Sequence, residues 1–207
     1  MNEHPILFSS EMMRAILMGN KTQTRRVIKT QPEFNADGCM SAKLEVPPIW
    51  YDFYSINGKT KRIKCPYVKG MNLWVRETFA VDGHYKDGKG YCYRADGDKA
   101  TQWKPSIFMP RQASRIILEV TDIRVERVQN ISDGDIGHEG ISWNEPPQFE
   151  KRNLSRGISP AQRAFCRLWD EINFKRGFSW EKNPWVWVIE FKRLQALDSA
   201  EIRRLGK

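Results

Sequence analysis

The sequence predicts an α+β domain built around a curled, mostly antiparallel sheet with two or three flanking helices. Three observations lead to this prediction: a long strand whose apolar alternation changes phase, a late strand that is apolar on both faces, and amphipathic segments that begin at capping residues. The phase change predicts a β-bulge, which lets a sheet curl. We therefore expect a small β-barrel with helices outside it.

Composition favours a basic protein that acts on an anionic partner. Of the 207 residues, 40% are hydrophobic, which is enough for a sizeable core. The 34 Lys and Arg residues outnumber the 25 Asp and Glu residues, so the formal net charge is +9. This excess favours a nucleotide or RNA as partner, although a basic surface that serves only solubility has the same composition.

Targeting, membrane and metal signals are missing from the sequence. There is no signal peptide, and no apolar run approaches the roughly 20 residues of a membrane span, so we expect a cytoplasmic protein without membrane contact. The four cysteines form no C-x-x-C pair, and the three histidines are not grouped with them. We expect free thiols, no metal and no cofactor.

The first elements lead into a dense polar stretch. Residues 6–8 predict a short strand, and a helix begins after the capping residue Ser9 and ends at Gly19. Residues 21–26 (KTQTRR) then alternate like a strand and place an amine, two hydroxyls, an amide and two guanidiniums in six positions. This density favours a bound anionic or polar group; an ordinary basic surface is the alternative. One side of this strand is expected to carry Thr22, Thr24 and Arg26, and the other side Lys21, Gln23 and Arg25.

Two weakly patterned regions are predicted to be insertions. Residues 31–69 contain adjacent prolines and an Asn57-Gly58 turn signal, which predicts a hairpin. Residues 70–79 form a strand, and residues 82–111 are again rich in turn residues, with a short hairpin expected within them.

The long strand over residues 115–128 begins directly after Ser114, so Ser114 and Arg115 stand at its mouth. Its apolar alternation shifts by one residue near Thr121-Asp122, which is where we expect the bulge. A short helix follows, with Ser132 as N-cap and Gly140 as its end.

Glu139 is expected at the C-terminal end of that short helix. The negative end of the helix dipole disfavours an ionised carboxylate there. An exposed helix-end carboxylate without a function is the alternative. A second helix is predicted from Ser159-Pro160 to residue 172, and residues 185–191 form a strand that is apolar on both faces. We expect residues 1–194 to be a single domain and residues 195–207 to be a polar tail.

Three sequence blocks together resemble the ASCH family, whose fold is similar to that of the PUA RNA-binding domains. They are residues 19–26 (G-x-K-T-x-T-x-R), residues 131–142 with D-I-x-x-E-G-I, and residues 188–192 (VIEFK). Residues 70–77 and 104–110 look like those of larger ASCH proteins carried by phages and prophages. The resemblance implies a PUA-like β-barrel.

A small bacterial ASCH protein is an amidohydrolase that removes the acetyl group from acetylcytidine. The resemblance implies a hydrolase with Thr24 as nucleophile, Lys21 as proton acceptor and Glu139 as proton donor. A threonine hydroxyl is a poor nucleophile until a base takes its proton, so Lys21 would have to be neutralised by burial or by nearby guanidiniums. Substrate-binding roles are expected for Arg26, Ser114 and Arg115.

Two other functions are open at this point. An RNA-binding module would grip phosphate in a basic cleft and stack a base on an aromatic ring. A ribonuclease is a further alternative, since nuclease activity has been associated with ASCH proteins, but none of the three histidines lies in the matching motifs. The chain is much longer than the small enzyme, and the added insertions make an oligonucleotide or tRNA an alternative to a free nucleoside. Protein partners are not indicated.

Overall fold

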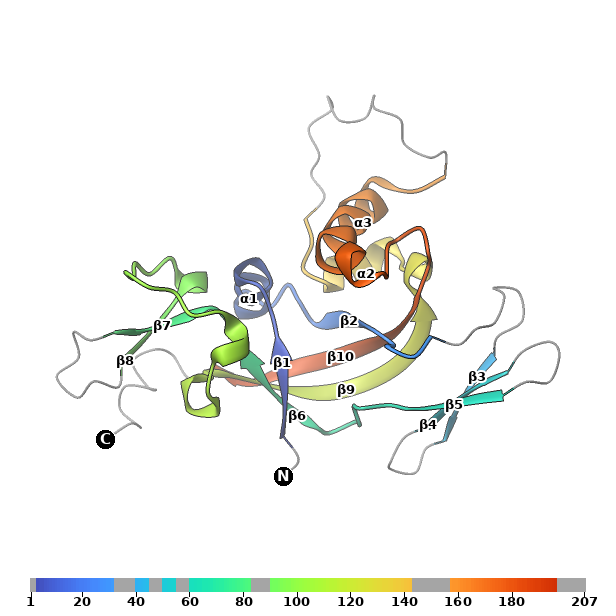
Figure 1. The fold of residues 1–207 in the computed structure, drawn as a ribbon, viewed down its shortest axis with the longest axis horizontal. Helices are drawn as coiled ribbons and strands as arrows, with labels where there is room; N and C mark the ends of the chain where they lie inside the picture. Colours follow the sequence, from blue (N-terminus) through green and yellow to red (C-terminus); the bar gives the residue numbers. More distant parts are fainter. Residues whose placement is uncertain are drawn as a thin grey trace. The chain divides into compact units, whose positions relative to one another are not determined.

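The structure is a computed structural model that describes residues 3–31, 40–44, 50–54, 60–82, 90–142 and 157–196. It divides into two compact units. Unit 1 comprises Met1–Thr22, Lys69–Thr121 and Phe191–Lys207, and unit 2 comprises Gln23–Val68 and Asp122–Glu190. Figure 1 labels the elements of both. The single domain over residues 1–194 stays a prediction.

The main sheet has five strands in the order β1-β6-β9-β10-β2. Its short strands are β1 (Glu3–Leu7), β6 (Asn72–Arg76) and β2 (Gln23–Val27), and its long strands are β9 (Ile116–Arg127) and β10 (Trp185–Ala196). β1 pairs with β6 in parallel, whereas β6 with β9 and β10 with β2 pair antiparallel. Each long strand contributes residues to both units.

The predicted α+β class is confirmed, but the described strands form a mixed sheet with two ends and no closed barrel. A parallel pair needs a crossover connection, and the chain leaves β1 through α1 (Ser10–Leu17) before it returns in the same direction as β6. The apolar pattern of residues 6–8 identified a strand but not this direction. Barrel closure would need β1 and β2 to pair, and the strand order contains no such pair.

The buried positions of β9 change phase at the predicted place. Ile116, Leu118 and Val120 are buried, and the next buried residue is Ile123. The change falls at Thr121-Asp122, where β9 passes from unit 1 to unit 2. The bulge itself stays a prediction.

In unit 1, the helix α1 begins and ends as the sequence predicts. The Ser9 hydroxyl accepts a hydrogen bond from the Met12 N–H, and Gly19 follows the helix at a φ of +80°. Met13 and Ile16 are buried. β7 (Phe79–Asp82) and β8 (Gly90–Tyr93) form an antiparallel hairpin. It begins at Phe79, whereas the sequence predicted a hairpin within residues 82–111.

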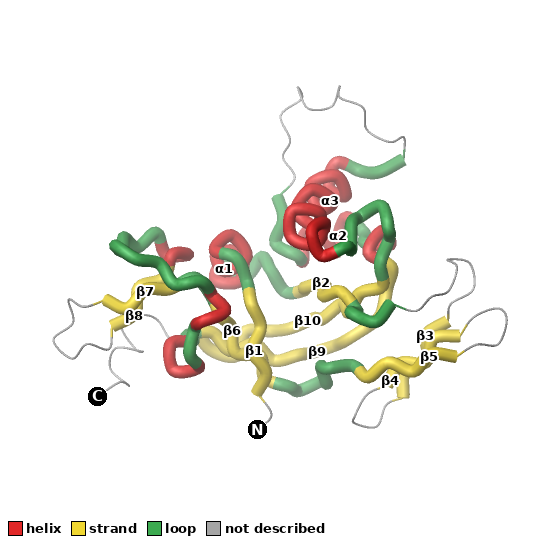
Figure 2. The backbone as a smooth tube through the Cα atoms, viewed as in Figure 1, coloured by secondary structure: helices red, strands yellow, loops and turns green. Residues whose placement is uncertain are grey.

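In unit 2, β3 (Met40–Leu44), β4 (Trp50–Tyr54) and β5 (Thr60–Lys64) form a three-stranded antiparallel sheet (Figure 2). β4 and β5 are the predicted hairpin, whose Asn57-Gly58 turn lies outside the described residues. The short β3 was not predicted, because no apolar alternation marks it. The predicted tail also lies outside the described residues, apart from the last residues of β10.

Two helices cover the β2 part of unit 2 (Figure 1): α2 (Asp133–His138) and α3 (Pro160–Asn173). The apolar core between them and the sheet comprises Val128, Ile131, Ile136, Ala161, Phe165, Trp169, Trp180, Val186 and Val188. α3 begins with a complete capping box, because the Ser159 hydroxyl accepts from the Gln162 N–H and the Gln162 side chain accepts from the Ser159 N–H.

Replacing Ser159 by alanine is expected to lower the free energy of unfolding by about 1–2 kcal/mol. The substitution removes the cap of α3 and also the hydrogen bond that the Ser159 hydroxyl donates to Asp133 at 2.5 Å. Urea denaturation measures the effect. Ser10→Ala is the matched control, because Ser10 is the first residue of α1 and not its cap. An equal loss of stability in both variants would contradict the capping role.

Candidate functional site

Three consecutive residues of β2 are almost completely buried although all are polar. Gln23, Thr24 and Arg25 are 1%, 1% and 4% exposed. Burial of a charge is costly unless partners compensate it. The partners of Arg25 therefore determine what this strand can do.

The Arg25 guanidinium contacts three carboxylates and one amide. Nη1 donates to Gln23 Oε1 at 2.9 Å and to Glu139 Oε1 at 3.3 Å. Nη2 donates to Glu126 Oε2 at 3.0 Å and to Asp135 Oδ2 at 3.2 Å. The buried Nε has no hydrogen-bond partner in the part of the chain that the structure describes. Four hydrogen bonds thus fix the guanidinium in one orientation.

A second guanidinium, from Arg124 of β9, contacts two of these carboxylates and a further one, Glu190. Its Nε donates to Glu126 Oε1 at 2.5 Å, its Nη2 to Asp135 Oδ1 at 3.0 Å, and its Nη1 to Glu190. We call this group the Arg25 cluster; it consists of Gln23, Arg25, Arg124, Glu126, Asp135, Glu139 and Glu190. Its carboxylates outnumber its guanidiniums by two, so the cluster is acidic within an otherwise basic chain.

Asp135 is held ionised by the cluster. Burial would raise the pKa of its carboxyl, but Arg25, Gln23, Ser132 and Arg124 more than offset this, and the pKa lies below its ordinary value of 3.8. A carboxyl whose pKa is lowered by folding stabilises the native state above its unfolded pKa and loses that contribution as the pH falls through its folded pKa.

Asp135→Asn is therefore expected to destabilise the protein by about 1–3 kcal/mol at pH 7 and by progressively less below about pH 4. The physical reason is that protonation removes from the wild type the same charge that the substitution removes. Urea denaturation of both proteins between pH 7 and pH 3 gives the difference. A difference that does not shrink in acid would show that Asp135 contributes through shape and not through charge.

The structure places the three predicted catalytic residues as follows. Glu139 is the C-cap residue of α2, as predicted, but it is 6% exposed, which excludes an exposed helix-end carboxylate. Thr24 pairs with Ile189 of β10, and strand alternation puts it on the face of β2 opposite Arg25. Lys21 belongs to unit 1; it is 2% exposed, and its Nζ lies 5.7 Å from the centre of the Phe8 ring.

Arg26 shares its face of β2 with Thr24, as predicted. Burial lowers the pKa of Arg26 below its ordinary value, Tyr67 and Glu139 act against this, and Arg176 adds to it. Glu139 therefore interacts with both guanidiniums of the strand: with Arg25 by contact and with Arg26 through its charge.

The other two predicted substrate-binding residues lie in unit 1. Ser114 is buried and donates its hydroxyl to the Val75 carbonyl at 2.7 Å. Arg115 is paired through two nitrogens each with Glu77 and Asp96, at distances of 2.5–3.1 Å. Burial would lower the pKa of Arg115, but these carboxylates raise it above its ordinary value. These contacts favour a structural role for both residues.

Sequence analysis identified Arg25 only as a neighbour of Lys21, and it did not identify Arg124 or Glu126. One signal was present: Arg124 and Glu126 are two positions apart in a strand, so both side chains point to the same face of a largely apolar element. Such a pair needs partners from other elements, and the sequence does not show which.

Metal and membrane features can be checked in the same part of the chain. Among the described residues, no group of three or more His, Cys, Asp or Glu side chains is arranged to hold a metal ion. Across those same residues, none of the helices has the length and apolar character that crossing a membrane requires.

The fold and the site define an α+β protein with a partly buried acidic cluster around one strand. No protein-family model and no curated protein matches the sequence. Among solved structures, the chain is similar to a crystal structure of an ASCH domain from Lactobacillus crispatus JV V101, with 13% sequence identity and a TM-score of 0.42. The match covers 94% of this chain and 80% of that chain. This similarity concerns the fold, and no activity follows from it.

Proposed function

We propose that this protein is an amidohydrolase that removes an N-acyl group from a modified pyrimidine nucleoside such as acetylcytidine. One observation carries the proposal: polar residues from three distant parts of the sequence converge on one cluster, whose buried centre contains Glu139 together with Gln23 and Arg25. Gln23 and Arg25 of β2 contact Asp135 and Glu139 across 110 to 114 sequence positions, and Gln23 contacts Glu190 across 167. These are the three blocks that resemble the ASCH family.

The burial of Gln23, Arg25 and Glu139 in this cluster supports a functional site. Charged residues are seldom fully buried, and buried groups with specific charge partners gather at sites of catalysis and binding. Arg25 holds Glu139 at 3.3 Å and so fixes the position of that carboxyl group. We therefore assign Arg25 a positioning role, which the sequence resemblance does not include.

In the proposed reaction, the Thr24 hydroxyl oxygen attacks the acyl carbonyl carbon. Lys21, three residues earlier in the chain, accepts the hydroxyl proton, and Glu139 donates a proton to the departing amine of cytosine. The C–N bond breaks, the acyl group remains as an ester on Thr24, and water then hydrolyses the ester. Arg26, on the Thr24 face of β2, would stabilise the negative charge that develops on the carbonyl oxygen. Ser114 and Arg115 are not part of the proposal.

Release of cytidine from acetylcytidine by the purified protein tests this function. Turnover is expected for the wild type and its loss is expected for Lys21→Ala. A wild type that hydrolyses neither acetylcytidine nor other N-acylated pyrimidine nucleosides would contradict the proposal.

A second candidate function is an RNA- or nucleotide-binding module without catalysis. The formal net charge of +9 favours it, because phosphate neutralisation dominates nucleic-acid affinity. Such binding weakens steeply as salt rises. If the protein binds no RNA at low salt, this candidate fails.

A further inference from the structure

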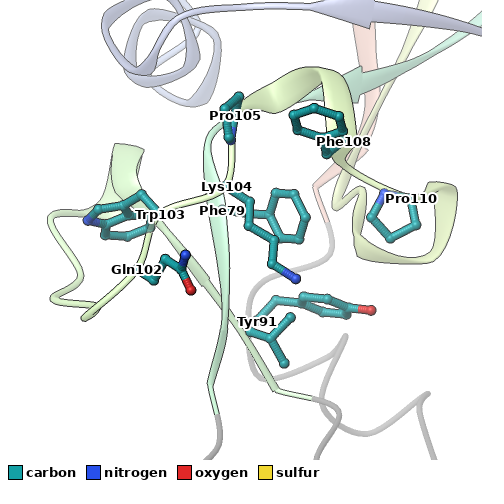
Figure 3. Close-up of a pocket in the computed structure, with 9 residues that line it drawn as sticks. Phe79, Tyr91, Gln102, Trp103, Lys104, Pro105, Phe108 and Pro110 are labelled. Carbon is teal, nitrogen blue, oxygen red and sulfur yellow. The ribbon is translucent and has the colours of Figure 1, made fainter.

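A pocket of about 570 Å³ lies in unit 1, at the β7–β8 hairpin and the segment that follows it (Figure 3). Four aromatic side chains line it: Phe79, Tyr91, Trp103 and Phe108. The volume is in the range of small-molecule binding sites. Neither the candidate catalytic residues nor those of the Arg25 cluster are among the residues that line it, so it is a separate feature of the chain.

This pocket has a buried aromatic ring at its base, and its sides are open. Phe79 is buried and its ring centre lies 6.1 Å from that of Tyr91. Phe108 is 69% exposed, which is unusual for a phenylalanine. In Figure 3, Trp103 lies on the opposite side of Phe79 from Phe108, and Lys104 extends toward Tyr91. Flat apolar faces are thus open to a ligand.

Backbone hydrogen bonds fix this pocket in shape. Phe79 and Lys104 exchange two backbone hydrogen bonds, at 2.7 and 3.2 Å. Arg76 Nε donates to the Met109 carbonyl at 3.1 Å and thereby holds the segment that carries Phe108. A preformed pocket loses little conformational entropy when it binds a ligand. The structure therefore provides a binding surface and not merely a gap.

We propose that this pocket binds an unpaired base of a single-stranded nucleic acid. Aromatic rings stack on any base, and stacking platforms combined with positive charge are how proteins bind single strands. Trp103 and Phe108 supply the stacking faces, Lys104 the positive charge for a neighbouring phosphate, and Gln102 an amide that can bond a base edge. No carboxylate is among the described residues that line the pocket, which suits an anionic ligand.

A proline-rich peptide is the competing occupant, because aromatic grooves also bind such peptides. Charge decides between the two: the described lining residues include a lysine and no carboxylate, and together with the net charge of +9 this complements a phosphate backbone. The inference deepens the proposed function, because a base-binding pocket implies that the pyrimidine nucleoside is presented within an oligonucleotide. It rests on the proposed function only for this kind of substrate.

Fluorescence anisotropy with a labelled 12-nucleotide oligouridylate and the full chain tests the inference. Trp103→Ala and Phe108→Ala are each expected to weaken binding roughly 10- to 100-fold, as for the loss of one stacked base. Phe174→Ala is the matched control, because Phe174 is 65% exposed and lies in unit 2; it is expected to bind like the wild type. Lys104→Ala is expected to lower the salt dependence by about one counterion.

Two further titrations exclude charge attraction as the sole cause of binding and a proline-rich peptide as the ligand. An RNA duplex of equal length hides its bases, so the wild type and Phe108→Ala are expected to bind it equally. Equal oligouridylate affinity in the wild type and both pocket variants would overturn the inference. So would a matching loss in Phe174→Ala, or binding of decaproline that depends on Phe108.

Failure of the proposed function is distinguishable, because binding is measured without turnover. If acetylcytidine is never hydrolysed but binding still depends on Trp103 and Phe108, the amidohydrolase fails and the base-binding pocket stands.

Discussion

Replacing Thr24 by valine is expected to abolish hydrolysis of acetylcytidine, with a loss in kcat of at least about 10³-fold. Valine has nearly the volume of threonine, so the buried position in β2 stays filled, but the attacking oxygen is gone. Thr24→Ser is the complementary variant: it keeps the hydroxyl, removes the methyl group, and should retain measurable turnover. Release of cytidine under single-turnover conditions compares all three proteins.

Thr22→Val serves as the matched control, because Thr22 is an exposed threonine only two positions away. It should hydrolyse acetylcytidine at the wild-type rate. The same rate in Thr24→Val would rule out Thr24 as the nucleophile. Glu139→Gln then separates proton donation from packing, since glutamine fills the same space and can still accept a hydrogen bond from Arg25 but cannot give up a proton.

Arg25→Met is expected to lower the free energy of unfolding by about 3–5 kcal/mol, the range for removal of one partner of a buried ion pair. The methionine fills part of the space but leaves Glu126, Asp135 and Glu139 without the cation between them. Arg124 still contacts Glu126 and Asp135, so Glu139 is the carboxylate that loses its contact with Arg25 and gains none with Arg124. Urea denaturation monitored by tryptophan fluorescence measures the change.

Arg14→Met provides the contrast, because Arg14 and its partner Glu11 are 45% and 77% exposed. Exposed pairs of this kind contribute less than about 1 kcal/mol. The double variant Arg25→Met with Glu139→Gln should recover part of the loss, because the second substitution removes a buried negative charge that Arg25 compensates in the wild type. A loss in Arg25→Met as small as that in Arg14→Met would mean that the cluster does not depend on Arg25.

Local signals in the sequence predicted most helix boundaries. Ser9, Ser132 and Ser159 all cap helices as expected, because a cap depends on a few adjacent residues. The strands were found where apolar residues alternate, as in β9, or follow one another without interruption, as in β10. The direction of β1 and the existence of β3 were missed, because pairing partners and crossovers depend on distant parts of the chain.

The candidate site was only partly predictable for the same reason. The sequence indicated that residues 21–26 and Glu139 belong to one site, and Arg25 indeed contacts Glu139. The sequence did not indicate that Arg25 is the buried centre of a cluster, because the carboxylates that Arg25 contacts lie 101 to 114 positions away. Whether Lys21, Thr24 and Glu139 act together in catalysis stays a prediction.

The division of β9 and β10 between the two units has a consequence for synthesis on the ribosome. Unit 1 draws on chain segments before residue 23 and after residue 190, so β1 and α1 emerge long before the β10 residues that complete their unit. β1 pairs with β6, so the apolar residues of β1 and α1 wait for the Lys69–Thr121 segment of unit 1 to emerge, and the β10 residues that complete the unit emerge later still. Until then these apolar residues stay exposed, a state in which nascent chains depend on chaperones.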